Sequence, residues 1–145
     1  MIALASDHGG LALKTAVKTY LEGQGLEVRD FGTNSPDSCD YPDFGAPAAR
    51  AVADGTCERG ILICTTGIGM SMVANKIPGV RCALCHDLMS ARLTRQHNDT
   101  NVLALGAGVV GEMLALEIIK VWLNTDFEGG RHARRIGKVM DLDQR

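Results

Sequence analysis

The fold of this chain is decided by residues 60–71, which read GILICTTGIGMS. The apolar run from Gly60 to Cys64 predicts a short buried strand. Gly67 and Gly69 then form a glycine-rich turn, and a helix is expected over residues 67–75. A strand that delivers a thiol to the N-terminus of a helix places backbone N–H groups near that thiol. The stretch therefore predicts a reactive cysteine beside an anion-binding turn.

The same alternation of strand and helix extends through the rest of the chain. Short apolar runs predict strands over residues 1–5, 26–31, 60–64, 80–85 and 101–105. Helical spacing predicts helices over residues 13–21, 46–53, 67–75, 87–96 and 110–123, with a last short helix within 131–143. Residues 32–47 hold three of the four prolines and are expected to form a long polar loop. The pattern predicts an α/β fold: a single-domain doubly wound (Rossmann-like) parallel five-stranded sheet, with helices on both faces, spanning residues 1–145.

Composition narrows the class of protein. The net charge of −2 argues against the basic surface that binds nucleic acid or an anionic membrane. The apolar runs are too short to cross a bilayer, and the chain begins directly in a predicted strand, so we expect a cytoplasmic protein. Five cysteines without a disulfide framework predict free thiols. The predicted helix over 110–123 is apolar nearly all round, which indicates a homodimer.

Candidate site residues follow the predicted strands, because open parallel sheets bind ligands at the carboxyl ends of their strands. They are Asp7 and His8, residues 64–69, His86 and Asp87, and residues 106–108. At Cys64 the following helix would stabilise a thiolate, which can act as a nucleophile or as the base for a carbon acid. A buried core cysteine is the alternative interpretation.

Two nucleotide-binding motifs do not match the glycine turn. Met72 stands where a dinucleotide fingerprint needs its third glycine, and the turn follows the third predicted strand instead of the first. A phosphate-binding loop of the Walker type would need Gly-Lys-Ser/Thr after the turn, which is missing.

Residues 82–86, CALCH, match the spelling of a haem-attachment, dithiol or zinc motif. Within a strand, residues three apart point to opposite faces, so the sulfurs of Cys82 and Cys85 cannot reach one partner. Zinc would also need a second ligand pair. We therefore expect these residues to be structural.

Two polar segments lie outside the glycine turn. His97, between a helix end and the last strand, can serve as a general acid and base, or as part of a solvated helix cap. Arg131 and Arg135 are one helical turn apart and suit a phosphate, although an exposed basic tail would look the same. His8 is either a turn residue or a third phosphate contact.

Taken together, these motifs resemble the type B ribose-5-phosphate isomerase family, which includes the allose- and galactose-6-phosphate isomerases. The resemblance follows the whole chain in order through DHGG (7–10), DYP (40–42), ICTTGIGMS (63–71), ANK (74–76), RQHND (95–99) and GGRH (129–132). It implies interconversion of ribose 5-phosphate and ribulose 5-phosphate through a cis-enediolate, a reaction of carbohydrate metabolism and the pentose phosphate pathway, without metal or nucleotide.

The resemblance also implies a role for each candidate residue. Cys64 would carry the proton between C2 and C1, and Thr66 would assist proton movement between the sugar oxygens. His97, helped by Asp43 or Tyr41, would open the furanose ring. The remaining substrate-binding set would be Gly67, Ile68, Gly69, Met70 and Ser71 for the enediolate, Asp7, Tyr41 and Asn98 for hydroxyls, and His8, Arg131 and Arg135 for the phosphate. In this family the site is shared within a homodimer or a dimer of dimers, His97 and the arginines coming from the neighbouring subunit.

Two positions depart from the family pattern. Met70 stands where the branch that lacks the cysteine has a glutamate, so the chain resembles the cysteine branch. Thr65 stands where a glycine is usual, and its side chain narrows the pocket or alters the turn. Isomerisation of a hexose 6-phosphate or a free rare sugar is the alternative on the same site, and a non-catalytic sugar-phosphate-binding or flavin-binding module is the alternative of another class.

Overall fold

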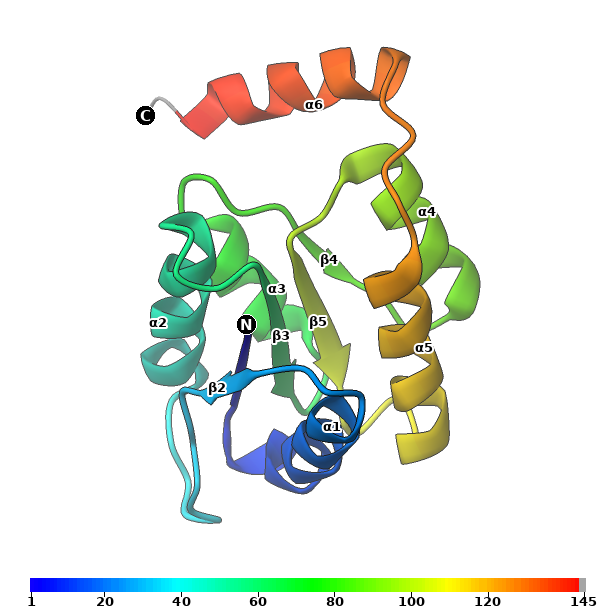
Figure 1. Cartoon of the computed structure of the whole chain (residues 1–145). Helices are drawn as coiled ribbons and strands as arrows, with labels where there is room; N and C mark the ends of the chain where they lie inside the picture. Colours follow the sequence, from blue (N-terminus) through cyan, green and yellow to red (C-terminus); the bar gives the residue numbers. More distant parts are fainter. Residues whose placement is uncertain (144–145) are drawn as a thin grey trace.

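The computed structural model describes residues 1–143 and shows a five-stranded parallel sheet between two layers of helices (Figure 1). The strands are β1 (Ile2–Ser6), β2 (Val28–Asp30), β3 (Arg59–Cys64), β4 (Cys82–Leu84) and β5 (Val102–Gly106). The α-helices are α1 (Leu11–Gly23), α2 (Tyr41–Ala53), α3 (Ile68–Asn75), α4 (Leu88–Asn98), α5 (Glu112–Asn124) and α6 (Arg131–Met140). Short 3₁₀ turns lie at His8–Gly10 and Asp141–Asp143. The predicted doubly wound fold is confirmed.

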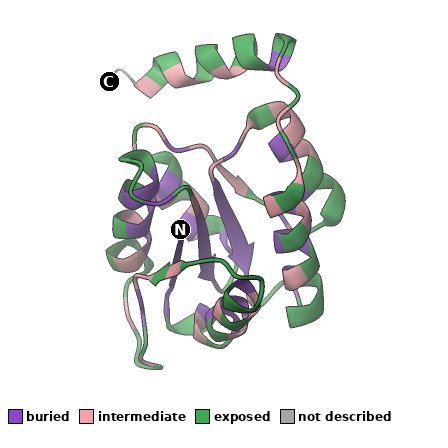
Figure 2. Cartoon of the chain, viewed as in Figure 1, coloured by how far each residue is buried: buried purple, intermediate pink, exposed green. Residues whose placement is uncertain are grey.

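The strand order is β2-β1-β3-β5-β4, with every neighbouring pair parallel. Side chains of each strand alternate between two cores, as in β3, where Ile61 and Ile63 face one core and Leu62 and Cys64 the other. Helices α1, α4 and α5 cover the first face, while α2 and α3 cover the second. Both faces of the central strands are therefore buried (Figure 2).

The chain reverses its direction of winding between β1 and β3. After β1 it crosses one face through α1 to β2, whereas after β3 it crosses the other face through α3 to β4. The carboxyl ends of these two neighbouring strands form the topological switch point, where open α/β sheets bind their ligands. Asp7 follows β1 there and Thr65 follows β3.

The predicted loop over residues 32–47 is wrong in its second half, because α2 already begins at Tyr41. Pro42 lies in the first turn of the helix, where backbone N–H groups have no helical partner, so proline is tolerated. Pro47 lies inside α2 and interrupts its hydrogen-bond ladder without ending it. The helix predicted over residues 46–53 therefore began too late.

The remaining loop between β2 and α2 is anchored to the body by a buried lysine. Lys14 Nζ on α1 donates to Asp30 Oδ1 at 2.6 Å and to Asn34 Oδ1 at 2.9 Å. Lys14 is only 2% exposed, so the ion pair compensates the cost of burying its charge. This contact holds the loop beside the turn that follows β1.

Helix α5 buries only one side against the sheet, although its sequence is apolar nearly all round. Ile118, Ile119 and Trp122 are buried against the sheet, while Met113 is 83% exposed. Trp122 Nε1 donates to Thr100 Oγ1 at 3.0 Å, which satisfies its buried N–H. Within residues 1–143, no helix has the length and apolar character needed to cross a membrane.

Candidate active site

Cys64 lies at the last position of β3, and its sulfur faces the first turn of α3. The side chain is 5% exposed, and the Gly67 N–H donates to Cys64 Sγ at 3.1 Å. Gly67 has φ 75°, and a β-carbon there would lie 2.6 Å from Leu84 Cδ1 and 2.8 Å from the Leu105 carbonyl carbon. Only glycine fits this turn, and its N–H is thereby aimed at the sulfur. The Cys64 sulfur therefore has a backbone hydrogen-bond donor at the N-terminus of α3.

The turn leaves fewer free backbone donors than its sequence indicates. The Ile68 N–H donates to Thr66 Oγ1 at 3.3 Å, and the Ser71 N–H donates to the Gly67 carbonyl at 3.0 Å. Gly69 and Met70 keep N–H groups that have no partner among residues 1–143. An anion beside Cys64 would therefore meet the N–H groups of Gly69 and Met70 at the N-terminus of α3.

Met70 contributes only its backbone to this turn. Its side chain is fully buried between α2 and α3, where its sulfur would lie 2.5 Å from a β-carbon on Gly45. The absence of that β-carbon lets the two helices approach closely and fixes the start of α3.

Tyr41 covers the same helix N-terminus from α2. A β-carbon at Gly69 would lie 2.6 Å from Tyr41 Cζ, so the ring packs directly on the glycine backbone. Asp43 is exposed in the first turn of the same helix. The early start of α2 is therefore what brings Tyr41 to the turn that follows Cys64. Thr66 packs its backbone against Gly106, where a β-carbon would lie 2.6 Å from the Thr66 carbonyl oxygen.

The turn after β1 forms the other wall of the switch point. The Asp7 carboxylate is buried and accepts the Gly10 N–H at 3.1 Å, and the Asp7 N–H donates to the Ile63 carbonyl at 3.3 Å. His8 is exposed, and its Nδ1 accepts the Cys39 N–H at 3.2 Å. Because Nδ1 acts as the acceptor, the neutral ring carries its proton on Nε2 and can donate it to a ligand oxygen. Sequence reasoning missed Cys39, which lies 31 residues from His8.

A second cluster forms where the C-terminus of α4 meets the start of α6. The rings of His97 and His132 stack with centroids 4.4 Å apart and 12° between their planes. Burial lowers the pKa of His132, and the neighbouring His97 and Arg131 lower it further. Arg131 and Arg135 are exposed in successive turns of α6. Their spacing confirms that both start from one side of this helix.

Two arginines hold the end of α4 that carries His97 and Asn98. Arg95 Nη1 donates to Asp99 Oδ1 at 2.9 Å and to the Thr100 carbonyl at 2.6 Å. Arg81 donates through Nε to the Asn98 carbonyl at 3.1 Å and through Nη2 to the Asp99 carbonyl at 2.7 Å. These bonds satisfy carbonyls that a helix C-terminus leaves open. Sequence reasoning missed Arg81, because no local pattern shows which helix end it meets.

The two clusters lie at opposite ends of the sheet. Cys64 pairs with Gly106 at the carboxyl end of β5, whereas the α4 end with His97 leads into the start of β5 at Val102. Figure 1 shows α6 lying across the end of the sheet away from the strand arrowheads. Within a single chain, therefore, His97, Arg131 and Arg135 do not reach Cys64.

Comparison with known proteins assigns this arrangement to a family. Residues 2–139 match the family model described as Ribose/Galactose Isomerase. The chain belongs to the ribose/galactose isomerase family. It is 47% identical over 144 residues to ribose-5-phosphate isomerase B of Escherichia coli, covering 99% of this chain and 97% of that protein.

Two further family members are similar to this chain over nearly its whole length. The ribose-5-phosphate isomerase B structure from Clostridium thermocellum superposes with a TM-score of 0.97 at 52% identity, covering 99% of this chain and 97% of the other. A D-erythrulose-4-phosphate isomerase of Pectobacterium atrosepticum is 45% identical over 139 residues, covering 95% of this chain and 91% of that protein. Members of the ribose/galactose isomerase family with similar sequence identity to this chain are thus named for different sugar phosphates.

One group of side chains in this family member has the composition of a metal site. His97, Glu128 and His132 place one ligand atom each within 4.8 Å of one another. The histidine rings are nearly parallel, however, so their nitrogen lone pairs lie in parallel planes and do not converge on one ion. Glu128 Oε2 instead lies 3.6 Å from His132 Nε2, an ion pair whenever His132 is protonated.

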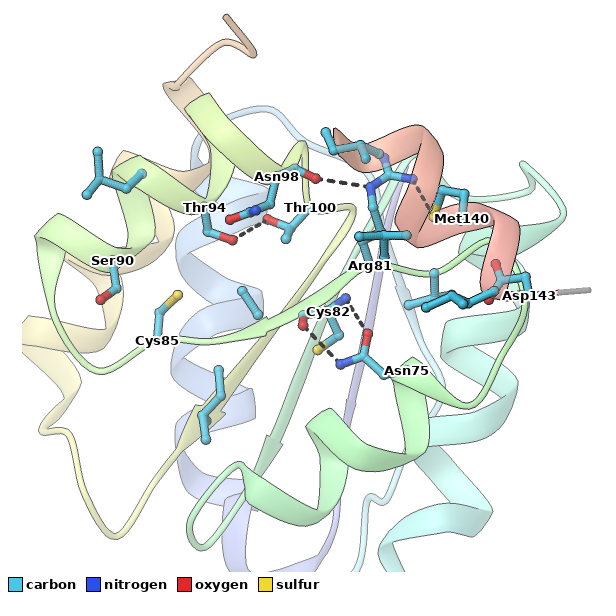
Figure 3. A pocket seen from close by; sticks show the side chains of 17 residues that line it. Asn75, Arg81, Cys82, Cys85, Ser90, Thr94, Asn98, Thr100, Met140 and Asp143 are labelled. Atoms are coloured by element: carbon cyan, nitrogen blue, oxygen red, sulfur yellow. Dashed lines mark hydrogen bonds between the residues drawn. The ribbon is translucent and has the colours of Figure 1, made fainter. Parts of the chain in front are cut away.

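A groove of about 690 Å³ separates α6 from β4 and α4 (Figure 3). Its walls include apolar side chains of α6 and the turn after it, Ile136, Val139, Met140 and Leu142, opposite Leu84 and Leu93. Helix α6 is attached across the groove by a contact of Arg81 Nη1 with Met140 Sδ at 3.5 Å. The Gly79 N–H also donates to Asp143 Oδ2 at 2.8 Å. Neither Cys64 nor His8 lines this groove.

Cys82 and Cys85 occupy different cores, Cys85 with α4 and α5 and Cys82 with α2 and α3. This confirms that their sulfurs point to opposite faces of the sheet. Burial raises the pKa of Cys85 to about 11 and raises the pKa of Cys82 well above its ordinary value. Both thiols stay protonated at neutral pH, which supports a structural role.

Proposed function

We propose that this chain is an aldose–ketose isomerase that interconverts D-ribose 5-phosphate and D-ribulose 5-phosphate through a cis-enediolate. The observation that carries the proposal is the Cys64 sulfur, which accepts the Gly67 N–H beside the free N–H groups of Gly69 and Met70. Isomerisation needs a base that takes a proton from a carbon next to a carbonyl, and donors that stabilise the resulting oxyanion. Both lie at the switch point.

In the proposed mechanism the Cys64 thiolate takes the proton from C2 of the open-chain aldose and returns it to C1. The negative charge that develops on the carbonyl oxygen is stabilised by the N–H groups of Gly69 and Met70. Thr66 passes the hydroxyl proton from O2 to O1, so the ketose forms with no net gain or loss of protons. A positioned base is commonly worth about 10²- to 10⁴-fold in rate, and one oxyanion donor about 10²- to 10³-fold.

The other candidate residues bind and prepare the substrate. His8 donates Nε2–H to the phosphate, and Arg131 and Arg135 add charged donors. Asp7, Tyr41 and Asn98 bind the hydroxyls, and His97 opens the furanose ring with Asp43 or Tyr41. Phosphate binding far from the reacting carbons converts affinity into orientation at Cys64.

The proposed active site requires a homodimer, alone or as a dimer of dimers. His97, Arg131 and Arg135 lie at the end of the sheet away from Cys64. A second copy that places its α4–α6 cluster over the first copy's switch point completes the site. The apolar side of α6 along the groove, with exposed Leu84, Leu88 and Met89, offers the surface that such a dimer would bury. Five free cysteines suit the reducing cytoplasm in which we place the enzyme.

The deciding experiment is conversion of ribose 5-phosphate to ribulose 5-phosphate by the purified chain and its Cys64→Ala variant. We expect turnover by the wild type and a fall in kcat of about 10²- to 10⁴-fold in the variant. Cys57→Ala is the matched control, because Cys57 is also buried but lies in the turn before β3. Equal, measurable turnover by wild type and Cys64→Ala would exclude Cys64 as the base, whereas no turnover by the wild type would favour a non-catalytic sugar-phosphate-binding protein.

A further inference from the structure

We propose that Thr65 limits the length of the substrate, because its side chain lies between Gly9 and Gly108 at the switch point, so that sugars of five carbons or fewer fit and hexose 6-phosphates do not. The inference rests on the proposed isomerase function and assigns a specificity role to a residue outside the reacting groups.

Thr65 is exposed, and both branches of its side chain meet a glycine. A β-carbon on Gly9 would overlap Thr65 Oγ1, and one on Gly108 would lie 3.2 Å from Thr65 Cγ2. The Gly108 N–H also donates to the Thr65 carbonyl at 2.8 Å. The side chain is therefore held between the turn after β1 and the loop after β5.

This position lies between the two groups that would hold the ends of the substrate. Alternation along β3 directs Cys64 toward α2 and α3, so the next side chain, Thr65, points toward the face of α1 and α5. There it meets Gly9, the neighbour of the proposed phosphate ligand His8. A sugar chain that runs from the Cys64 sulfur to His8 passes Thr65.

Hydrogen bonds hold both ends of this path in place. Cys64 is fixed by the sheet and by the Gly67 N–H at 3.1 Å. His8 is fixed by the Cys39 N–H, and its turn by the bonds of Asp7 to Gly10 and Ile63. A hexose 6-phosphate adds one hydroxymethylene unit between the reacting carbons and the phosphate. The threonine side chain is comparable in size to that unit, so it occupies the space that the longer sugar would need.

The test compares kcat/KM for allose 6-phosphate and for ribose 5-phosphate in wild type, Thr65→Gly, Thr65→Ala and Thr65→Val. We expect the ratio of the two values to rise about 10- to 100-fold in Thr65→Gly, the usual effect of one such unit in a pocket. Thr65→Ala should give a smaller rise. Thr65→Val keeps the shape without the hydroxyl and should keep the wild-type ratio.

A ratio of two substrates separates a specificity effect from damage to the turn. A glycine that merely loosened the turn would lower both values together and leave the ratio unchanged. An unchanged ratio in Thr65→Gly and Thr65→Ala, with ribose 5-phosphate still turned over by wild type, overturns the inference alone. A wild type that isomerises neither sugar phosphate overturns the proposed function and this inference with it.

Competitive inhibition gives a second readout that needs no turnover of the longer sugar. The probes are 5-phosphoribonate and 6-phosphogluconate, measured against ribose 5-phosphate. We expect Thr65→Gly to improve inhibition by 6-phosphogluconate relative to 5-phosphoribonate by about 10-fold. Equal relative inhibition in Thr65→Gly and wild type would contradict the length limit.

Discussion

The imidazole of His97 stacks on that of His132 at 4.4 Å, and the pair joins the end of α4 to the first turn of α6. Two protonated rings at this distance would repel each other, and Arg131 and Arg135 add further positive charge. The neutral form of His132 is therefore part of what keeps α6, and with it the proposed phosphate ligands, in place.

The attachment of α6 should weaken in mild acid. Burial is the first cause that lowers the pKa of His132, so the folded chain binds this proton less readily than the unfolded chain. Stability from this group is present above the ordinary histidine pKa of about 6.5 and is lost as the pH falls toward the lowered value. Hydrogen exchange of the α6 amides at pH 8 and pH 5.5, each corrected for the intrinsic exchange rate at that pH, should show less protection in acid.

His132→Phe keeps a stackable ring without the proton and should remove most of that pH dependence. His8→Asn, which changes an exposed histidine outside this cluster, should leave it intact. Identical pH dependence of α6 exchange in wild type and His132→Phe would show that the stack does not control this helix.

Removing one guanidinium from α6 should weaken substrate binding more than turnover. We expect Arg135→Ala to raise KM for ribose 5-phosphate about 10-fold, since a charge-assisted hydrogen bond is typically worth about 1.5–3 kcal/mol. Steady-state kinetics check this against Arg92→Ala, which removes the same charge from an exposed position on α4. A matching rise in KM in both variants would point to the general field of the protein instead of a direct contact.

The close approach of Tyr41 to Gly69 predicts a functional effect with little loss of stability. In Gly69→Ala the new methyl would displace the far end of the Tyr41 ring, because the two would lie 2.6 Å apart. We expect kcat/KM to fall about 10-fold through misplaced substrate contacts, while Tm changes by only a few degrees.

Gly137→Ala supplies the contrast for this substitution. That glycine is in the interior of α6, and its β-carbon would meet nothing within 4 Å. Alanine there should stabilise the helix by up to about 1 kcal/mol and leave kinetics unchanged. If Gly69→Ala behaved like Gly137→Ala, Tyr41 would not order the N-terminus of α3 for substrate.

A mixture of two inactive variants should regain activity if the site is shared between subunits. Cys64→Ala lacks one half of the site and His97→Asn the other, so a hybrid dimer contains one intact site and one doubly damaged site. Because random exchange makes half of the dimers hybrids, the mixture should reach about a quarter of wild-type activity per subunit. The measurement is ribose 5-phosphate turnover after unfolding and refolding the two variants together.

The same two variants refolded separately and then assayed together provide the control. Recovery only after joint refolding supports a shared site. No recovery, with hybrid dimers verified by a size or charge tag, would mean that each chain uses its own Cys64 and His97.

Much of the fold could be predicted because its signals are local. The apolar run of β3, the glycines after Cys64 and the helical spacing of α1, α3 and α5 each lie within one short segment. Once five strands alternate with helices, parallel winding follows from the short connections. Proline misled the prediction at α2, because whether it breaks a helix depends on its position relative to the helix start, and Tyr41 lies earlier than the spacing of apolar residues shows.

The sequence by itself determined the doubly wound sheet, the placement of Cys64 at a strand end, and the family resemblance carried by its motifs in order. Only the tertiary structure decided which backbone donors stay free at α3, that Thr65 lies between Gly9 and Gly108, and that His97 stacks on His132 at the far end of the sheet. Strands and turns arise from neighbours in the chain, whereas the contacts of Thr65 with the two glycines and of His97 with His132 join residues tens of positions apart. Such pairs meet only when the whole chain has packed.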